Sequence, residues 1–285
     1  MNEAFANRKR GAMSGDETDS SVFDEMMIDV GKQSLRVAIK RGSKERPPLL
    51  LFNGIGANLE LAKPFMRALK RTEAIIFDVP GVGGSPPPAA PYRPSTIARL
   101  ASQLITQLGH RRADVAGVSW GGGMAQQFAH QHYDMCRKIV LAATSPGAFM
   151  IPGDPRVLWK LATPRRYIDK DFMRRVAPEI YGGAFRKNPD FLATYAKAMT
   201  GTSERGYLYQ LLAMAGWTSL PWLWTLKQPA LILAGRDDPI VPPVNGRLMA
   251  WLMPNAKLKI LDDGHLFLVT SPVESAAIIE AFLIE

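Results

Sequence analysis

The sequence has a single cysteine, Cys136, among 285 residues. One cysteine excludes an intramolecular disulfide and fits a reducing compartment. No apolar run approaches the roughly 20 residues that are needed to span a bilayer. Residues 1–24 include a short basic run but no apolar stretch after it, so they do not resemble a secretory signal. We therefore expect a cytoplasmic protein whose residues 1–24 form a flexible tail.

Patterns that would indicate a metal or a cofactor are also missing. No spacing typical of metal ligands is present, and the glycines at 117–121 lack the downstream acidic residue of a dinucleotide fingerprint. We expect neither a metal nor a cofactor. The net charge is +9, but no zinc-finger pattern, RNA-binding signature or continuous basic helix accompanies it, so we expect no nucleic-acid partner.

Short apolar runs alternate with segments of helical spacing along most of the chain. The expected strands are 25–30, 34–41, 49–52, 73–78, 114–118, 138–142, 230–234 and 258–261, and the expected helices are 61–71, 95–108, 120–132, 246–252 and 273–283. Ser95 is the expected N-cap of its helix. The first two strands should form a hairpin. The alternation predicts an α/β fold, with a mostly parallel central sheet flanked by helices.

The alternation stops between two of the strands. Residues 145–227 contain helical segments but no convincing buried strand. We interpret residues 25–144 and 228–285 as the core, and residues 145–227 as an inserted helical lid over the strand ends, where open α/β sheets bind ligands.

Ser119 lies in a G-x-S-x-G frame between an apolar strand and the start of a helix. This frame is typical of the sharp turn that presents a nucleophilic serine above an α/β sheet. Side chains at Gly117 or Gly121 would collide with the neighbouring strand or helix. A chance match in a glycine-rich loop is the alternative, so the prediction depends on partners elsewhere in the chain.

A serine hydroxyl needs a base, and the base needs an orienting acid. His130 and His132 lie roughly 16–20 Å along the helix from Ser119, and His110 precedes the Ser119 strand, at the wrong end of the sheet. His265 follows the last expected strand, on the same side as Ser119. It is therefore the candidate base.

The acid should follow the preceding strand, where Asp237 and Asp238 are adjacent. We favour Asp238, because it lies in a Gly-x-x-Asp loop followed by x-Ile-Val-Pro, a pattern that resembles the acid loop of many enzymes with a serine nucleophile, and we expect Asp237 to be its solvated neighbour. Asp262 and Asp263 stay open as local orienting groups for His265.

A tetrahedral intermediate also needs preorganised N–H donors for its oxyanion. The backbone N–H of Trp120 follows the nucleophile, and the second donor should come from the loop after residue 52. We choose Ile55, with Gly56 as the alternative. Asp78, in a loop dense in proline and glycine, is expected to be structural, and Cys136 is expected to be inert.

About residues 25–283 resemble a known protein family, and several stretches carry this resemblance. They are residues 51–58, 117–122, 125–130, 164–167, 180–183, 216–219 and 262–268. The frame resembles the α/β-hydrolase superfamily, and these stretches are similar to the intracellular depolymerases of medium-chain-length polyhydroxyalkanoates. The resemblance implies a serine esterase that acts on a storage polyester, with Ser119, Asp238 and His265 as its triad. The loop departs from the superfamily in starting with Asn53-Gly54 rather than His-Gly.

The inserted segment holds 13 of the 25 aromatic residues, and between residues 147 and 227 it has 12 Lys or Arg against 6 Asp or Glu. Aromatic and basic surface would suit attachment to an apolar polyester granule; packing of the lid onto the core explains the aromatics equally well. The expected binding partner is therefore a polyester granule or a small ester substrate. A soluble-substrate carboxylesterase or lactonase and a C–C bond hydrolase are the alternative functions. A non-catalytic binding protein would usually lack one member of the triad.

Overall fold

The computed structural model describes residues 22–161, 169–188, 191 and 203–285. An eight-stranded sheet in the order β1-β2-β4-β3-β5-β6-β7-β8 runs through the molecule. Its strands are β1 (Phe23–Val30), β2 (Gln33–Lys40), β3 (Leu49–Phe52), β4 (Ala74–Phe77), β5 (Ala113–Val118), β6 (Cys136–Ala142), β7 (Ala230–Gly235) and β8 (Ala256–Leu261). β1 and β2 form the expected antiparallel hairpin, and all pairs from β4 to β8 are parallel. The predicted fold class is confirmed.

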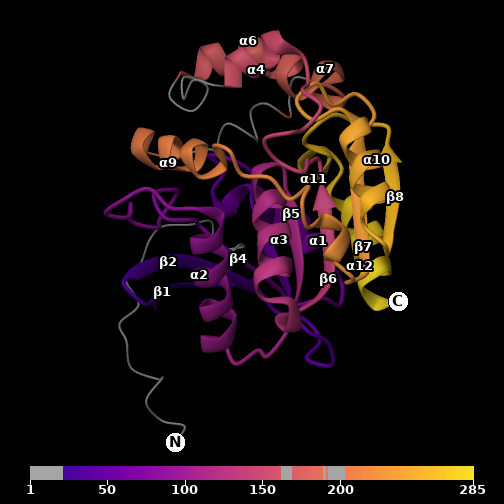
Figure 1. Ribbon diagram of the computed structural model, residues 1–285. Helices are drawn as coiled ribbons and strands as arrows, with labels where there is room; N and C mark the ends of the chain where they lie inside the picture. The colour runs from indigo at the N-terminus through magenta and orange to yellow at the C-terminus, as the bar shows by residue number, and fades with distance from the viewer. Residues whose placement is uncertain (1–21, 162–168, 189–190, 192–202) are drawn as a thin grey trace, which may run out of the picture.

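Helices cover both faces of this sheet (Figure 1). Those of the core are α1 (Lys63–Ala68), α2 (Pro94–Gln107), α3 (Trp120–Gln131), α10 (Pro243–Leu252), α11 (Phe267–Thr270) and α12 (Pro272–Ile284). Leu50 and Phe52 of β3 belong to one core cluster with α2, α3 and α10, whereas Leu49 and Leu51 belong to the other with α1 and α12. Because side chains alternate across a strand, burial on both faces requires the continuous apolar run that marks β3 in the sequence.

Several expected boundaries are wrong. The helix expected over 246–252, for example, is α10 and begins at Pro243. The tail was expected to reach residue 24, but β1 begins at Phe23, whose buried ring packs under Lys63 and Arg67; residues 1–21 lie outside the described residues. The helix expected over 61–71 is a 3₁₀ turn, η1 (Leu59–Ala62), followed by the shorter α1. Ser95 is not an N-cap, because α2 begins at Pro94, whose missing N–H and fixed φ suit the first helical position.

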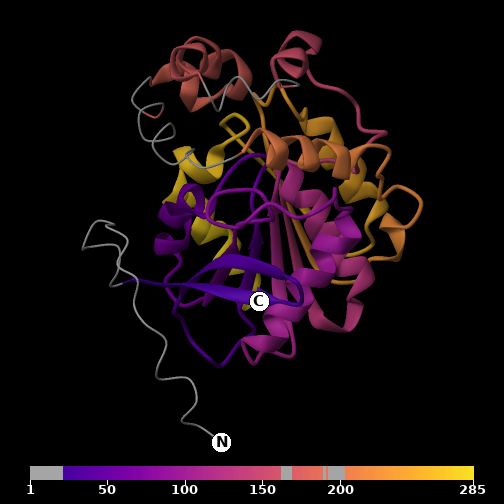
Figure 2. The same ribbon diagram turned by 90° about the vertical axis from the view of Figure 1, so that its left-hand side faces the viewer.

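The inserted segment, residues 145–227, separates β6 from β7, although these strands are neighbours in the sheet. Its described helices are α4 (Pro155–Leu161), α6 (Lys170–Tyr181), α7 (Ala184–Lys187), α9 (Glu204–Met214) and the 3₁₀ turn η3 (Leu223–Thr225). Figures 1 and 2 place α4, α6 and α7 beyond the carboxyl ends of the parallel strands. In the part of the chain that is described, no helix is both long and apolar enough to cross a membrane.

Candidate active site

Ser119 lies at the turn between β5 and α3, with φ 54° and ψ −118°. A positive φ is unusual for a residue with a side chain and costs roughly 1–3 kcal/mol, so the surroundings must hold it in place. The Ser119 N–H donates to the carbonyl of Ala142 over 2.9 Å, and its own carbonyl accepts from Gly122 N–H over 2.9 Å and from the Thr144 hydroxyl over 2.7 Å. The backbone of the serine is therefore fixed by β6 and by the first turn of α3.

The two glycines of the frame allow close packing on either side of the serine. A Cβ atom at Gly117 would lie 2.2 Å from the carbonyl oxygen of Gly121, and one at Gly121 would lie 2.2 Å from the carbonyl oxygen of Phe52. These are the collisions with helix and strand that the sequence predicts. Because Gly117 and Gly121 have no side chains, α3 can begin directly against the end of β3.

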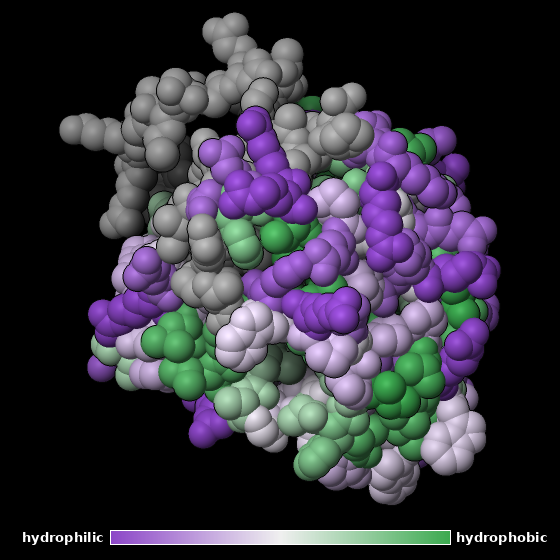
Figure 3. Space-filling view, turned by 90° about the horizontal axis from the view of Figure 1, so that it is seen from above, coloured by the Kyte–Doolittle hydropathy of each residue, from purple (hydrophilic) through white to green (hydrophobic). Residues whose placement is uncertain are grey.

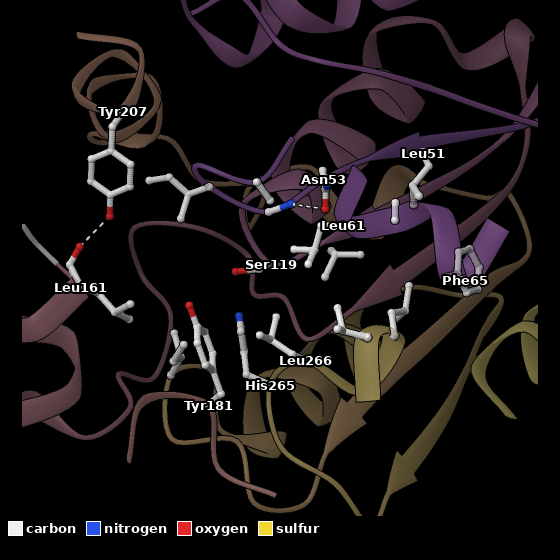
Figure 4. A pocket seen from close by; sticks show the side chains of 18 of the residues that line it. Leu51, Asn53, Leu61, Phe65, Ser119, Leu161, Tyr181, Tyr207, His265 and Leu266 are labelled. Carbon is white, nitrogen blue, oxygen red and sulfur yellow. Dashed lines mark hydrogen bonds between the residues drawn. The ribbon is translucent and has the colours of Figure 1, made fainter. Parts of the chain in front are cut away.

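His265 and Asp238 are both buried and are joined by a hydrogen bond of 2.7 Å between Nδ1 and Oδ2. The other carboxylate oxygen of Asp238 accepts the backbone N–H groups of Ile240 and Val241, each over 2.9 Å. With Nδ1–H donating to the carboxylate, Nε2 of the neutral ring is the free acceptor. Figure 4 shows the His265 ring and the Ser119 hydroxyl pointing into the same cavity.

No hydrogen bond joins Ser119 Oγ to His265 within the described ranges. Such bonds are often long in structures without substrate and tighten when substrate binds. The structure thus brings together the three side chains that were expected to form a triad, with the acid and the base already paired.

The other candidate acids have different partners. Asp237 is exposed, as expected for the solvated neighbour of Asp238. It also accepts from Gly183 N–H over 2.8 Å and from Arg186 Nη1 over 2.9 Å, so the inserted segment reaches back to it. Asp263 accepts from Ala184 N–H over 2.8 Å, and Asp262 pairs with Arg236 at the surface. Neither of these two carboxylates is bonded to the His265 ring.

The remaining histidines have other partners. His110 Nε2 lies 3.2 Å from Glu73 Oε1, and the His130 ring stacks on Trp222 with 4.3 Å between the ring centroids. His132 is partly buried, which lowers its pKa. Cys136 is the first residue of β6, and its Sγ–H donates to the Lys138 carbonyl. Burial raises the pKa of this thiol, which keeps it protonated, as expected for an inert cysteine.

The loop that was expected to supply an oxyanion donor, residues 53–58, lies beside Ser119; we call it the oxyanion loop. A Cβ atom at Gly54 would be 3.8 Å from Ser119 Cβ. The side chain of Asn53 forms two hydrogen bonds within this loop. Its Nδ2 donates to the Asn58 carbonyl over 2.6 Å, and its Oδ1 accepts from Gly54 N–H over 3.1 Å. On the other side, Trp120 is the first residue of α3, so its N–H has no acceptor within the helix and lies at the positive end of the dipole.

Gly56, one of the two candidates for the second donor, is linked to the inserted segment. Its N–H donates to the side-chain oxygen of Gln210, on α9, over 2.8 Å. Ile55, the other candidate, lines the same cavity as Ser119.

The cavity in front of Ser119 is largely apolar and is walled by both the core and the inserted segment (Figure 4). Its lining includes Leu51, Leu61, Phe65, Ile240, Leu266 and Leu268 from the core and Leu161, Tyr181, Tyr207 and Leu211 from the inserted segment. The sequence analysis did not single out these four residues of the inserted segment. Tyr181 lies in one of the stretches that carried the family resemblance, but nothing in its local pattern indicated a cavity wall.

The described residues contain no group of three or more His, Cys, Asp or Glu side chains that could hold a metal ion. Polar groups in the cavity are few, namely Ser119, His265, Asn53 and the hydroxyls of two tyrosines. Tyr207 donates its hydroxyl proton to the Leu161 carbonyl over 2.7 Å. The chemistry available is that of a serine with a buried histidine and carboxylate in an apolar cavity.

Comparison with known proteins agrees with this geometry. The model of the alpha/beta hydrolase fold family matches residues 47–272. The chain is 50% identical over 257 residues to a poly(3-hydroxyalkanoate) depolymerase of Ectopseudomonas oleovorans, covering 90% of this chain and 91% of that protein. It is 23% identical over 248 residues to 3-oxoadipate enol-lactonase 2 of Acinetobacter baylyi, covering 85% and 90% of the two chains.

Among solved structures, the fold is similar to that of an enol-lactonase from Burkholderia xenovorans LB400. The TM-score is 0.79 at 24% identity, over 91% of this chain and 100% of the other. A thermophilic esterase from Thermogutta terrifontis gives a TM-score of 0.76 at 21% identity, over 92% and 98%. At these identities the structural matches establish the fold.

Proposed function

The chain belongs to the alpha/beta hydrolase fold family, and from that premise we propose that it is a serine ester hydrolase that degrades medium-chain-length poly(3-hydroxyalkanoate) to 3-hydroxyacids or short oligomers. One observation carries the proposal: His265, which is hydrogen-bonded to the buried Asp238, lines the same apolar cavity as Ser119. The 50% identity to a poly(3-hydroxyalkanoate) depolymerase gives the substrate class.

In the first half of the proposed reaction, Ser119 Oγ attacks the ester carbonyl carbon while His265 Nε2 takes the hydroxyl proton. Asp238 holds the ring in the required tautomer and stabilises the imidazolium. The oxyanion is bound by the backbone N–H groups of Trp120 and Ile55. The C–O bond then breaks, His265 gives its proton to the departing alkoxide oxygen, which becomes the free hydroxyl end of the polymer, and an acyl-enzyme remains.

In the second half, His265 removes a proton from water, and the resulting hydroxide attacks the acyl carbon. Collapse of the second tetrahedral intermediate returns the proton to Ser119 and releases the carboxylic acid. The apolar walls suit the alkyl side chain of a medium-chain hydroxyacid, because burial of each methylene contributes about 0.8 kcal/mol.

The direct test is release of 3-hydroxyacid from medium-chain polyester granules by the purified protein, beside Ser119→Ala and a matched exposed-serine control, Ser95→Ala. We expect Ser119→Ala to lose at least about 10³-fold in rate and Ser95→Ala to keep the wild-type rate. Short p-nitrophenyl esters are measured in parallel.

Turnover of the p-nitrophenyl esters without release from granules would replace the polyester assignment by a soluble-substrate esterase or lactonase. Absence of both activities would favour a C–C bond hydrolase or a binding protein. Equal loss in both serine variants would contradict the assignment of Ser119 as nucleophile.

The proposed location is the cytoplasm, at the surface of the polyester granule. The single, buried cysteine fits a reducing compartment. In the inserted segment, Phe149, Trp159 and Trp224 are largely exposed, which suits insertion into an apolar surface. Trp222, by contrast, packs against the core and stacks on His130. Some aromatic residues of this segment therefore pack against the core, and others are candidates for attachment to the granule.

A further inference from the structure

Gln210, on α9, connects the inserted segment to both sides of the nucleophile. Its side chain is almost completely buried, with 1% of the residue exposed. Its Oε1 accepts the Gly56 N–H over 2.8 Å. Its backbone carbonyl accepts the indole Nε1–H of Trp120 over 2.9 Å. One residue therefore contacts the oxyanion loop and also the residue that follows Ser119.

The start of α9 is fixed to the core, so Gln210 is held from outside the oxyanion loop. A Cβ atom at Gly206 would lie 1.9 Å from the carbonyl oxygen of Gly81, which shows how closely the two backbones approach. Ser203 Oγ donates to the same carbonyl over 3.2 Å and accepts Gly206 N–H over 3.0 Å. Arg205 Nη2 donates to the Ala89 carbonyl over 3.1 Å. These contacts give α9 a defined position relative to the segment between β4 and α2.

Oxyanion donors are effective only when they are fixed before the reaction, because reorientation during catalysis would consume the stabilisation that they provide. The oxyanion loop leaves the sheet after Phe52, and the side chain of Asn53 bonds only within that loop. The Gln210 amide oxygen fixes the orientation of the Gly56 N–H, and hence the peptide that follows Ile55. The Gln210 carbonyl fixes the indole of Trp120, whose backbone N–H is the other proposed donor.

We propose that Gln210 is a positioning residue that fixes a group next to each proposed oxyanion donor, namely the Gly56 N–H beside Ile55 and the indole of Trp120, so that the inserted segment completes the catalytic site as well as covering it. This inference rests on the proposed function, since it assumes an oxyanion intermediate. Gln210 itself does not touch the reacting atoms. It acts through Gly56 and Trp120.

The test uses Gln210→Met, which keeps the approximate size of the side chain and removes the acceptor. We expect kcat for p-nitrophenyl octanoate to fall about 10- to 100-fold, less than the roughly 10²- to 10³-fold typical of deleting a donor outright. KM should stay within about threefold, because the lost interaction acts in the transition state. The inhibition constant of an alkylboronic acid, which forms a tetrahedral adduct with the serine, should rise by a factor similar to the loss in kcat/KM.

Leu212→Ala is the matched control, because Leu212 is on the same helix but is exposed. We expect it to keep the wild-type kcat and boronate affinity. Trp120→Phe removes the indole donor to the Gln210 carbonyl together with part of the ring volume. It should shift both quantities in the same direction as Gln210→Met, and it keeps the inference testable if Gln210→Met does not fold.

Three results would overturn the inference: a kcat of Gln210→Met within twofold of wild type, a fall in kcat with unchanged boronate affinity, or the same losses in Leu212→Ala. If Gln210→Met does not fold, wild-type kcat and boronate affinity in Trp120→Phe would overturn it. A wild-type protein with no Ser119-dependent ester turnover would instead remove the proposed function, and this inference with it. The soluble ester and the boronic acid separate these outcomes from any effect on granule attachment.

Discussion

Asp78, directly after β4, is a buried carboxylate outside the catalytic cavity. It accepts N–H groups from Leu59 over 2.7 Å and from Gly84 over 2.9 Å, and it lies 3.8 Å from Arg36. Burial raises its pKa to about 6, although these hydrogen bonds and the guanidinium oppose the shift. The residue therefore fixes the loop after β4, which agrees with its expected structural role.

The raised pKa predicts a pH dependence of stability. The pKa of Asp78 is about 6 in the folded state, against an ordinary value of 3.8. Between these two pH values, the folded state therefore binds the Asp78 proton more tightly than the unfolded state does. The stabilisation that comes from this tighter proton binding is thus complete below about pH 4 and is lost as the pH rises through 6, with an amplitude of about 3 kcal/mol. Urea unfolding of wild type and Asp78→Asn at pH 4, 5, 6 and 7 measures it.

We expect the stability of wild type relative to Asp78→Asn to fall across this range. A difference that stays constant with pH would contradict the prediction. Asp262→Asn is the control, because that carboxylate is exposed and Arg236 lowers its pKa, so no such fall is expected between pH 4 and 7.

At the scale of the elements, the inserted segment joins the core close to every proposed catalytic loop. The end of α6 accepts His265 N–H at the Tyr181 carbonyl over 2.8 Å, Gly183 N–H donates to Asp237, and Ala184 N–H donates to Asp263. α9 contacts the oxyanion loop through Gln210. Movement of this segment as a single body would therefore disturb the loops that carry Asp238 and His265.

The close approach of α9 to the loop after β4 predicts the effect of Gly206→Ala. The new Cβ would meet the Gly81 carbonyl at 1.9 Å, and because both partners are backbone, the helix must move. We expect a loss of about 1–3 kcal/mol in the free energy of unfolding, as in other overpacked sites, together with a lower kcat for soluble esters. Urea unfolding and ester turnover measure the two effects.

Gly246→Ala provides the comparison, since Gly246 also lies in a helix, but its nearest neighbours to a new Cβ are side-chain atoms at 3.3–3.5 Å. Removing a helical glycine should change stability by no more than about 1 kcal/mol there. Similar behaviour of the two alanine variants would contradict the prediction.

At the scale of the whole molecule, the face above the strand ends combines charged and apolar surface. Figure 3 shows hydrophilic side chains gathered across this face, with separate apolar clusters beside them. Trp159 on α4 is 81% exposed, and Trp251 on α10, outside the inserted segment, is 80% exposed. Two equally exposed tryptophans on different parts of the surface allow the proposed granule attachment to be tested.

We expect Trp159→Ser to lower the fraction of protein that sediments with polyester granules by about fivefold, because the indole would no longer bury apolar area in the granule. Its kcat for p-nitrophenyl octanoate should be unchanged. Trp251→Ser should bind granules as wild type does. Equal binding of all three proteins would contradict attachment through α4, and equal loss in both variants would indicate attachment that does not depend on the inserted segment.

The sequence by itself determined the fold class and most of the strands, and it singled out Ser119, Asp238 and His265 as the candidate triad. These features depend on local patterns, because apolar runs mark buried strands and Gly117 and Gly121 mark the turn between strand and helix. Helix starts were less certain, as Pro94 and Ser95 show, since neighbouring residues compete for the cap.

Only the tertiary structure decided which residues surround the serine. Gly56 and Gln210 are 154 positions apart, and no pattern near either residue indicates the other. The same holds for Asp237, whose partners Gly183 and Arg186 come from the inserted segment. A contact between distant segments is set by how the helices pack against the sheet, so its partners become visible only when the chain is folded.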